Sequence, residues 1–88
     1  MNKLLEKYED EILVRMFQKE LIGIRYTSIE RVASKIKWQE IASEYRIKRS
    51  FQSVMRRLIN LQLVTDHGKS GKVASLTIAG VEYVKGLK

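Results

Sequence analysis

The first quarter of the chain carries hydrophobic side chains at the spacing of an α-helix. Leu5, Tyr8, Ile12 and Met16 recur every three or four residues, which predicts one amphipathic helix over residues 4–22. The glycine at position 23 can end this helix. Because the hydrophobic stripe is broad, it either lies wholly in the core or turns partly toward a second subunit.

Two shorter helices are predicted next. Thr27 or Ser28 can cap the first of them, and the hydrophobic residues that follow keep helical spacing. Residues 36–38 fit either the end of this helix or a short strand. Residues 38–45 are predicted to form the next helix, because its hydrophobic residues fall at i, i+3, i+4 and i+7. Residues 46–48 then form a tight link.

A fourth helix is predicted from about residue 50 to 62, and its two faces separate at 100° per residue. The hydrophobic face holds Phe51, Val54, Met55, Leu58 and Leu61. The opposite face holds Arg49, Gln52, Ser53, Arg56 and Asn60, while Ser50 and Arg57 flank it. This polar stripe has no acidic residue, whereas a solvated helix face usually mixes both signs. Arginine, glutamine, serine and asparagine are side chains that bond to base edges and phosphates.

The pattern changes to period two near the end of the chain. Residues 63–66 and 72–78 are predicted to be two strands of a hairpin, the second with hydrophobic residues Ala74, Leu76 and Ile78 at every other position. Residues 67–71 contain two glycines and a lysine and form the hairpin tip. A short helix is predicted over residues 79–87.

The positive charge of the chain lies in its second half. Residues 1–44 hold eight basic and eight acidic side chains, whereas residues 45–88 hold nine basic and two acidic ones, so 9 − 2 gives the whole net charge of +7. Such asymmetry favours a surface that faces a polyanion. The alternative is that the charge serves only solubility.

Composition also narrows the class of protein. The 88 residues suit one domain, and no hydrophobic run is long enough for a transmembrane helix. Cysteine is absent, which excludes disulfides and thiolate metal sites, and the charged first residues do not resemble a signal peptide. We therefore expect an intracellular, cytoplasmic protein that is not associated with a membrane.

Catalytic and cofactor motifs are weak. His67 has no companion ligands, so no metal site is expected. Gly68, Lys69 and Ser70 resemble the end of a phosphate-binding loop, but Leu63 occupies the position of its first glycine and a strand follows. The acidic residues 9–11 are most simply a helix-dipole feature. We expect no enzyme activity and no cofactor.

The order of helix, tight turn, helix and hairpin is more informative. Residues 39–45 look like the first helix of a helix-turn-helix motif, and residues 56–64 look like a recognition helix that enters a strand. Residues 76–84 are similar to the Leu-Thr-x-x-Gly-x-x-Tyr segment that closes many such domains. Over roughly residues 36–85 the chain therefore resembles the winged helix-turn-helix family of DNA-binding domains. Two residues depart from the family, because Arg46 in the turn and Gln62 before the first wing strand stand where glycine is frequent.

The resemblance implies a mainly α, α+β winged helix-turn-helix fold, with three or four helices, a two-stranded β-hairpin wing and a short C-terminal helix. It divides the single domain of residues 1–88 into a scaffold or dimerisation helix (1–22), a helix-turn-helix (38–62), a wing (63–78) and a C-terminal helix (79–88).

The resemblance also implies a mode of binding to double-stranded DNA. The helix over residues 50–62 would enter the major groove, and the wing would lie on the backbone or in the minor groove. The DNA-binding residues expected on this basis are Lys48, Arg49, Ser50, Gln52, Ser53, Arg56, Arg57, Lys69, Ser70 and Lys72. Such a protein would be a small transcriptional regulator associated with the nucleoid. It would read two half-sites as a homodimer formed through residues 4–22, with residues 79–87 contributing.

Other functions remain open at this stage. Winged helices also serve as protein-interaction adaptors, and replication or plasmid-maintenance proteins bind DNA with the same architecture. Single-stranded or RNA binding is less favoured, because Phe51 is the only aromatic residue in 46–72 and lies on the hydrophobic face.

Overall fold

The computed structural model describes residues 5–23, 27–66 and 73–87. This part of the chain forms a small α+β domain in which helices predominate, as the sequence predicts at this level. Its elements, in order, are α1 (Lys7–Gln18), β1 (Thr27–Ser28), α2 (Ile29–Lys35), α3 (Trp38–Glu44), α4 (Phe51–Asn60), β2 (Val64–Thr65), β3 (Val73–Leu76) and α5 (Ile78–Gly86).

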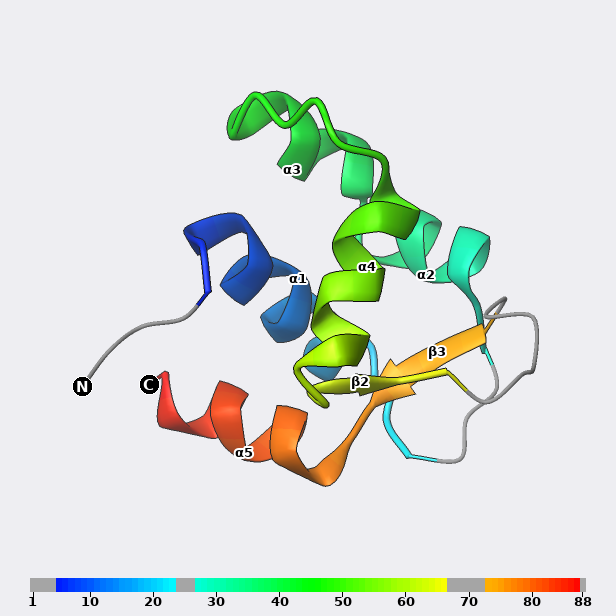
Figure 1. Cartoon of the computed structure of the whole chain (residues 1–88), viewed down its shortest axis with the longest axis vertical. Helices are drawn as coiled ribbons and strands as arrows, with labels where there is room; N and C mark the ends of the chain where they lie inside the picture. Colours follow the sequence, from blue (N-terminus) through cyan, green and yellow to red (C-terminus); the bar gives the residue numbers. More distant parts are fainter. Residues whose placement is uncertain (1–4, 24–26, 67–72, 88) are drawn as a thin grey trace.

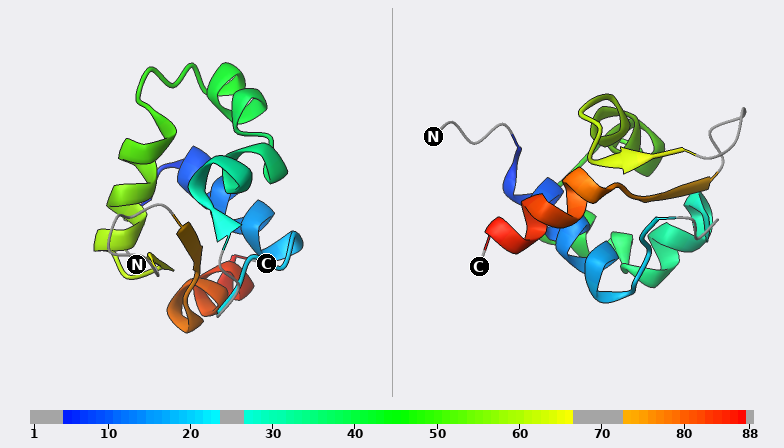
Figure 2. Two further views of the ribbon diagram at one scale, coloured as in Figure 1. Left: turned by 90° about the vertical axis from the view of Figure 1, so that its right-hand side faces the viewer. Right: turned by 90° about the horizontal axis from the view of Figure 1, so that it is seen from below.

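Helix α1 runs through the middle of the molecule, with α5 packed beside it and α4 toward the viewer in Figure 1. Its side chains Ile12, Leu13 and Met16 are fully buried. They belong to one hydrophobic cluster that also holds the buried face of α4, including Met55 and Leu58. Both views in Figure 2 place α4 at an outer edge of the domain, so its second face is turned away from this core.

Helix α1 is shorter than the predicted 4–22. It begins after Glu6, whose backbone N–H donates to Oε1 of Glu9 at 2.8 Å, and it ends at Gln18 rather than at the glycine of position 23. Glu20 takes a left-handed conformation with φ 59°, and Ile22 then forms an isolated parallel β-bridge with Leu76 of β3. Leu21 is still buried, and its carbonyl accepts from the backbone N–H of Leu76 in β3 at 2.8 Å. Residues 21 and 22 are therefore hydrophobic because they pack beside β3, and not because the helix continues through them as the sequence predicts.

Three helices end in a Schellman motif whose left-handed residue is not glycine, although glycine is usual there. After α1, the N–H of Leu21 donates to the carbonyl of Met16. After α3, the N–H of Ile47 reaches the carbonyl of Ala42, and Arg46 has φ 54°. After α4, Gln62 has φ 65° and the N–H of the next residue donates to the last turn. Each end is a Schellman motif built without glycine, which leaves conformational strain at positions 20, 46 and 62.

The helices α2 and α3 follow each other almost without a gap. Ser28 caps α2, because its Oγ accepts from the N–H of Arg31 at 3.1 Å. Lys37 then turns the chain with φ 59°, and α3 begins at the next residue. Residues 36–38 are therefore not a strand. Trp38 of α3 packs against Phe51 of α4, with ring centroids 5.0 Å apart, and this contact holds the two helices together across the link.

The sheet has three strands in the order β1-β3-β2, one more than predicted. The antiparallel pairing of β2 with β3 is confirmed, with Val64 opposite Leu76. The short strand β1 pairs with the other edge of β3 and was not predicted from the sequence. The central position of β3 corrects the expected alternation, because Ala74, Ser75 and Leu76 are all buried. Ser75 is accommodated there because its hydroxyl donates to the carbonyl of residue 23 at 2.7 Å.

Helix α5 docks on the junction between α4 and β2. Thr77 caps it, since its Oγ1 accepts from the N–H of Gly80 at 2.9 Å, and the same hydroxyl donates to the carbonyl of Gln62 at 2.7 Å. Gly80 lies directly over the carbonyl oxygen of Leu63, where a β-carbon would come within 2.2 Å. The sequence predicts Ile78 as the last hydrophobic residue of the second strand. Instead it belongs to α5 and is 80% exposed.

Candidate nucleic-acid interface

The start of α4 is fixed by a side-chain cap. The Oγ of Ser50 accepts from the backbone N–H of Ser53 at 3.2 Å, and the helix begins at Phe51. A capping serine satisfies one of the amide groups that the first helical turn leaves without a backbone acceptor. Ser50 is thus placed at the end of the helix that points to the α3–α4 link.

The two faces of α4 separate as the sequence predicts. Phe51, Val54, Met55 and Leu58 are buried. The opposite stripe, which we call the α4 polar face, consists of Arg49, Gln52, Ser53, Arg56 and Asn60; all of these are exposed except Ser53, which is half-buried. Within residues 49–60, all of which the structure describes, there is no acidic side chain. The outward position of α4 in Figures 1 and 2 agrees with the exposure of this stripe.

Arg49 lies at the edge of the α4 polar face. Its Nη2 donates to Oγ of Ser53 at 3.2 Å, so the guanidinium is drawn alongside the first turn of α4. In the described part of the chain, Arg49 takes part in no ion pair, and its side chain is exposed to solvent. Lys48 is exposed in the same link.

Arg57 has a different environment from the other arginines of α4. Its Nε donates to Oε2 of Glu9 at 2.8 Å, and Glu9 is fully buried in α1. The guanidinium side chain is 41% exposed. The pair fixes the orientation of α4 on α1, because a buried carboxylate is costly unless a cation or hydrogen-bond donors compensate it.

The next residue of α1 binds α5. The hydroxyl of Tyr83 donates to Oδ1 of Asp10 at 2.6 Å, and Asp10 is buried. Burial, reinforced by this hydrogen bond, raises the pKa of Tyr83 to about 12. The acidic cluster at residues 9–11 is therefore more than a helix-dipole feature, because Glu9 holds α4 and Asp10 holds α5.

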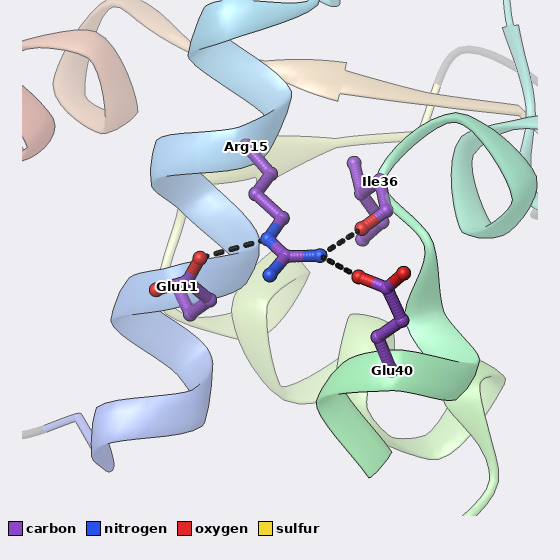
Figure 3. Close-up of polar contacts among 4 residues, drawn as sticks. All are labelled: Glu11, Arg15, Ile36 and Glu40. Atoms are coloured by element: carbon purple, nitrogen blue, oxygen red, sulfur yellow. Dashed lines mark hydrogen bonds and ion pairs between the residues drawn. The ribbon is translucent and has the colours of Figure 1, made fainter. Parts of the chain in front are cut away.

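The third acidic residue of the cluster belongs to a polar link between α1 and the α2–α3 corner (Figure 3). Arg15 donates from Nε to Glu11 at 2.7 Å and from Nη1 to the carbonyl of Ile36 at 2.8 Å, with Glu40 at 3.5 Å. The hydrogen bond to Glu11 is the main reason that the pKa of Arg15 is raised above its usual range, against the opposing effect of burial. Arg15 thus fixes the start of α3, which precedes the link to α4.

The remaining expected site residues are Lys69, Ser70 and Lys72, which the sequence predicts at the hairpin tip. They lie outside the described residues, so their relation to α4 stays a prediction. The described strands β2 and β3 pair in the register that brings Thr65 opposite Ser75. Of the expected site residues that the structure describes, Gln52, Ser53, Arg56 and Arg57 lie on α4, Ser50 caps it, and Lys48 and Arg49 lie in the link just before it.

Residues that the sequence did not indicate as site residues lie beside this face. Lys7 and Tyr8 at the start of α1 and Tyr45 at the end of α3 line a cleft together with Arg49 and Arg57. Only the three-dimensional packing joins residues so distant in sequence, and no local motif signals them.

The described residues contain no group of His, Cys, Asp and Glu that could hold a metal ion. Among the same residues, no helix is both long and hydrophobic enough to cross a membrane. Comparisons with protein-family models, with curated proteins and with solved structures give no match to the chain.

Proposed function

We propose that this chain is a winged helix-turn-helix protein that binds double-stranded DNA, with α4 in the major groove and the β2–β3 hairpin as its wing. The observation that carries the proposal is the exposed, acid-free α4 polar face on a helix whose other face is buried. The major groove is about 12 Å wide and admits one α-helix. A +7 charge confined to the second half of the sequence agrees with a polyanionic partner.

The backbone between the elements also supports the proposal. Arg46 after α3 and Gln62 after α4 both adopt left-handed conformations. These are the two positions at which the winged helix family often has glycine, so in this proposal the chain would form the family's turns with other residues. The antiparallel pair β2 and β3 directly after α4 is the arrangement expected of a wing.

Each residue of the interface has a proposed role. Arg49 and Arg56 would form bidentate bonds to guanine, and Gln52 would bond to adenine, because their planar donor groups match those base edges. Lys48 and Arg57 would contact phosphates, Arg57 in the orientation that Glu9 fixes. Lys69, Ser70 and Lys72 would place the wing on the backbone or in the minor groove.

We also propose that the protein acts as a homodimer. An apolar groove of about 470 Å³ lies between α1 and α5, lined in part by Val14, Phe17, Ile22 and Leu87. One helix reads only a few base pairs, and a two-fold dimer reads two half-sites. Leu87→Glu, at a residue that is 38% exposed, should shift sedimentation equilibrium toward the monomer without unfolding the domain.

Such a protein would regulate transcription in the cytoplasm by occupying its sites. The same chemistry would serve replication or plasmid maintenance, and selection of bound sequences from a random DNA library would identify its targets.

The test is a fluorescence-anisotropy titration with random duplex DNA at two salt concentrations. We expect micromolar or tighter binding that weakens steeply with salt, because phosphate contacts release counterions. Arg56→Ala should reduce affinity for a selected site more than affinity for random DNA, whereas Lys69→Ala should reduce both equally. Lys85→Ala, which removes an exposed charge from α5, is the control and should change neither. Absence of binding at low salt would overturn the proposal and favour a protein-interaction adaptor.

A further inference from the structure

A cleft of about 730 Å³ opens beside α4, between the start of α1 and the end of α3. Its walls come from three separate elements and the α3–α4 link. The residues that line it are Glu6, Lys7, Tyr8, Tyr45, Arg49 and Arg57.

The walls of the cleft favour an anionic group. Three of the lining residues are cationic and one, Glu6, is acidic. Glu9 compensates Arg57 from beneath, at 2.8 Å. Lys7 and Arg49 are exposed and form no ion pair with any residue that the structure describes. The charge available to a ligand therefore comes mainly from Lys7 in α1 and Arg49 in the α3–α4 link.

Two tyrosines complete the lining. The rings of Tyr8 and Tyr45 have centroids 6.4 Å apart at an interplanar angle of 44°, and Tyr45 is 37% exposed. A phenol offers a hydroxyl donor and an apolar ring. A phosphate that carries a sugar matches this combination, because its oxygens accept from lysine, arginine and phenol while the sugar packs on a ring.

The shape of the cleft distinguishes between two kinds of phosphate ligand. Pockets for small molecules are usually enclosed and mostly apolar. This cleft is open to solvent and its lining is largely charged. An open, charged channel fits a continuous strand better than a small molecule that must be surrounded.

The position of the cleft relative to α4 indicates which strand this is. Arg49 belongs both to the cleft and to the α4 polar face. An α-helix with its side chains is about 10–12 Å across and fills the major groove, so the sugar–phosphate backbones run along both of its flanks. In Figure 1, α1 and the end of α3 lie on one flank of α4.

We propose that this cleft is a phosphodiester site, in which Lys7, Tyr8 and Tyr45 hold the DNA backbone that flanks α4, next to the base contact proposed for Arg49. This inference rests on the proposed DNA binding and adds the start of α1 to the interface. Contacts to the backbone fix the register of the recognition helix without reading sequence. Lys7 and Tyr45 are thus positioning residues for the base contacts of the α4 polar face.

The test compares Lys7→Gln with Lys19→Gln in the anisotropy titration. Both changes remove one exposed charge next to or within α1, but Lys19 follows the opposite end of the helix. One phosphate contact contributes about 0.9 to the salt slope, which is about an eightfold change in affinity at 0.1 M salt. Lys7→Gln should therefore lose about eightfold for selected and random duplexes alike, and Lys19→Gln should match the wild type. Tyr45→Phe should lose affinity in the same uniform way, and circular dichroism melting checks that each variant is folded.

The outcomes separate the two proposals. If the wild type binds duplex and Lys7→Gln keeps its affinity and salt slope, the phosphodiester site is wrong while DNA binding stands. If the wild type binds no duplex, both fail. If the NMR signals of Lys7 and Tyr45 shift with a deoxynucleoside monophosphate but not with duplex, the cleft binds a free nucleotide, which overturns its assignment to the backbone.

Discussion

Replacement of Gly80 by alanine tests how α5 is held on the domain. The β-carbon of an alanine here would lie 2.2 Å from the carbonyl oxygen of Leu63, a backbone atom that cannot swing aside as a side chain can. Real β-carbons essentially never approach closer than 3.0 Å, so α5 or the α4–β2 junction must move by at least 0.8 Å, the difference between the two distances.

The expected magnitude follows from two opposing effects. Displacement of packed backbone costs about 1–3 kcal/mol, and the side chain of Leu76, 3.1 Å away, adds to the crowding. Alanine regains up to about 1 kcal/mol in helix propensity. We therefore expect Gly80→Ala to lower the free energy of unfolding by about 1–2 kcal/mol. Gly86→Ala in the same helix meets nothing within 4 Å and should be neutral or raise it by up to about 1 kcal/mol.

The assay is urea denaturation followed by circular dichroism, at one protein concentration because the domain is proposed to dimerise. The midpoint of Gly80→Ala should fall and that of Gly86→Ala should not, with similar slopes for both. If Gly80→Ala is as stable as Gly86→Ala, the close approach of α5 to Leu63 is not a feature of the folded protein.

Three further outcomes are expected. Gln62→Gly should stabilise the domain by about 0.5–1 kcal/mol in the same denaturation assay. Glycine relieves the left-handed strain at φ 65°, and the entropy that it adds to the unfolded chain offsets part of this gain. A loss of stability would contradict the Schellman ending of α4. The phenol of Tyr83 contributes stability that is complete below its unfolded pKa of 10.0 and is lost as pH rises through its folded pKa of about 12. An ultraviolet difference titration of the wild type against Tyr83→Phe should therefore show a tyrosinate step near pH 12. A step near pH 10 would refute the hydrogen bond from Tyr83 to Asp10. Arg57→Ala leaves the buried carboxylate of Glu9 without this cation and should lower the free energy of unfolding by about 3 kcal/mol. Glu9→Gln should lower it by only about 1–2 kcal/mol, because the exposed guanidinium of Arg57 can be solvated. Equal losses in parallel melts would argue against a buried Glu9.

The sequence is most informative where one helix has two chemically distinct faces. The hydrophobic residues of α4 fall on one side and the polar residues on the other, and a helix is the structure that this spacing fits. The face and the exposure of Arg49, Gln52 and Arg56 could therefore be predicted. The caps at Ser28 and Ser50 can be predicted equally well from the sequence, because a capping serine bonds to a backbone N–H only three residues further along the chain.

Other features depend on contacts between distant segments. The burial of Leu21 looks the same in sequence whether it is helical or extended, and the change of path rests on one left-handed residue, Glu20. Strand β1 has two residues, too few for any periodicity. The pair of Glu9 with Arg57 joins residues 48 apart, and therefore neither the fixed orientation of α4 nor the cleft beside it has a local signal.

The most direct test of the DNA-binding proposal is NMR mapping of the isotopically labelled protein during titration with a selected duplex. We expect the amide and side-chain signals of Arg49, Gln52, Ser53 and Arg56 to shift most, while the signals of the outer face of α5 around Glu82 stay unchanged. Shifts confined to α5, or no shift at any residue at low salt, would contradict the proposal that the α4 polar face is a DNA-binding surface.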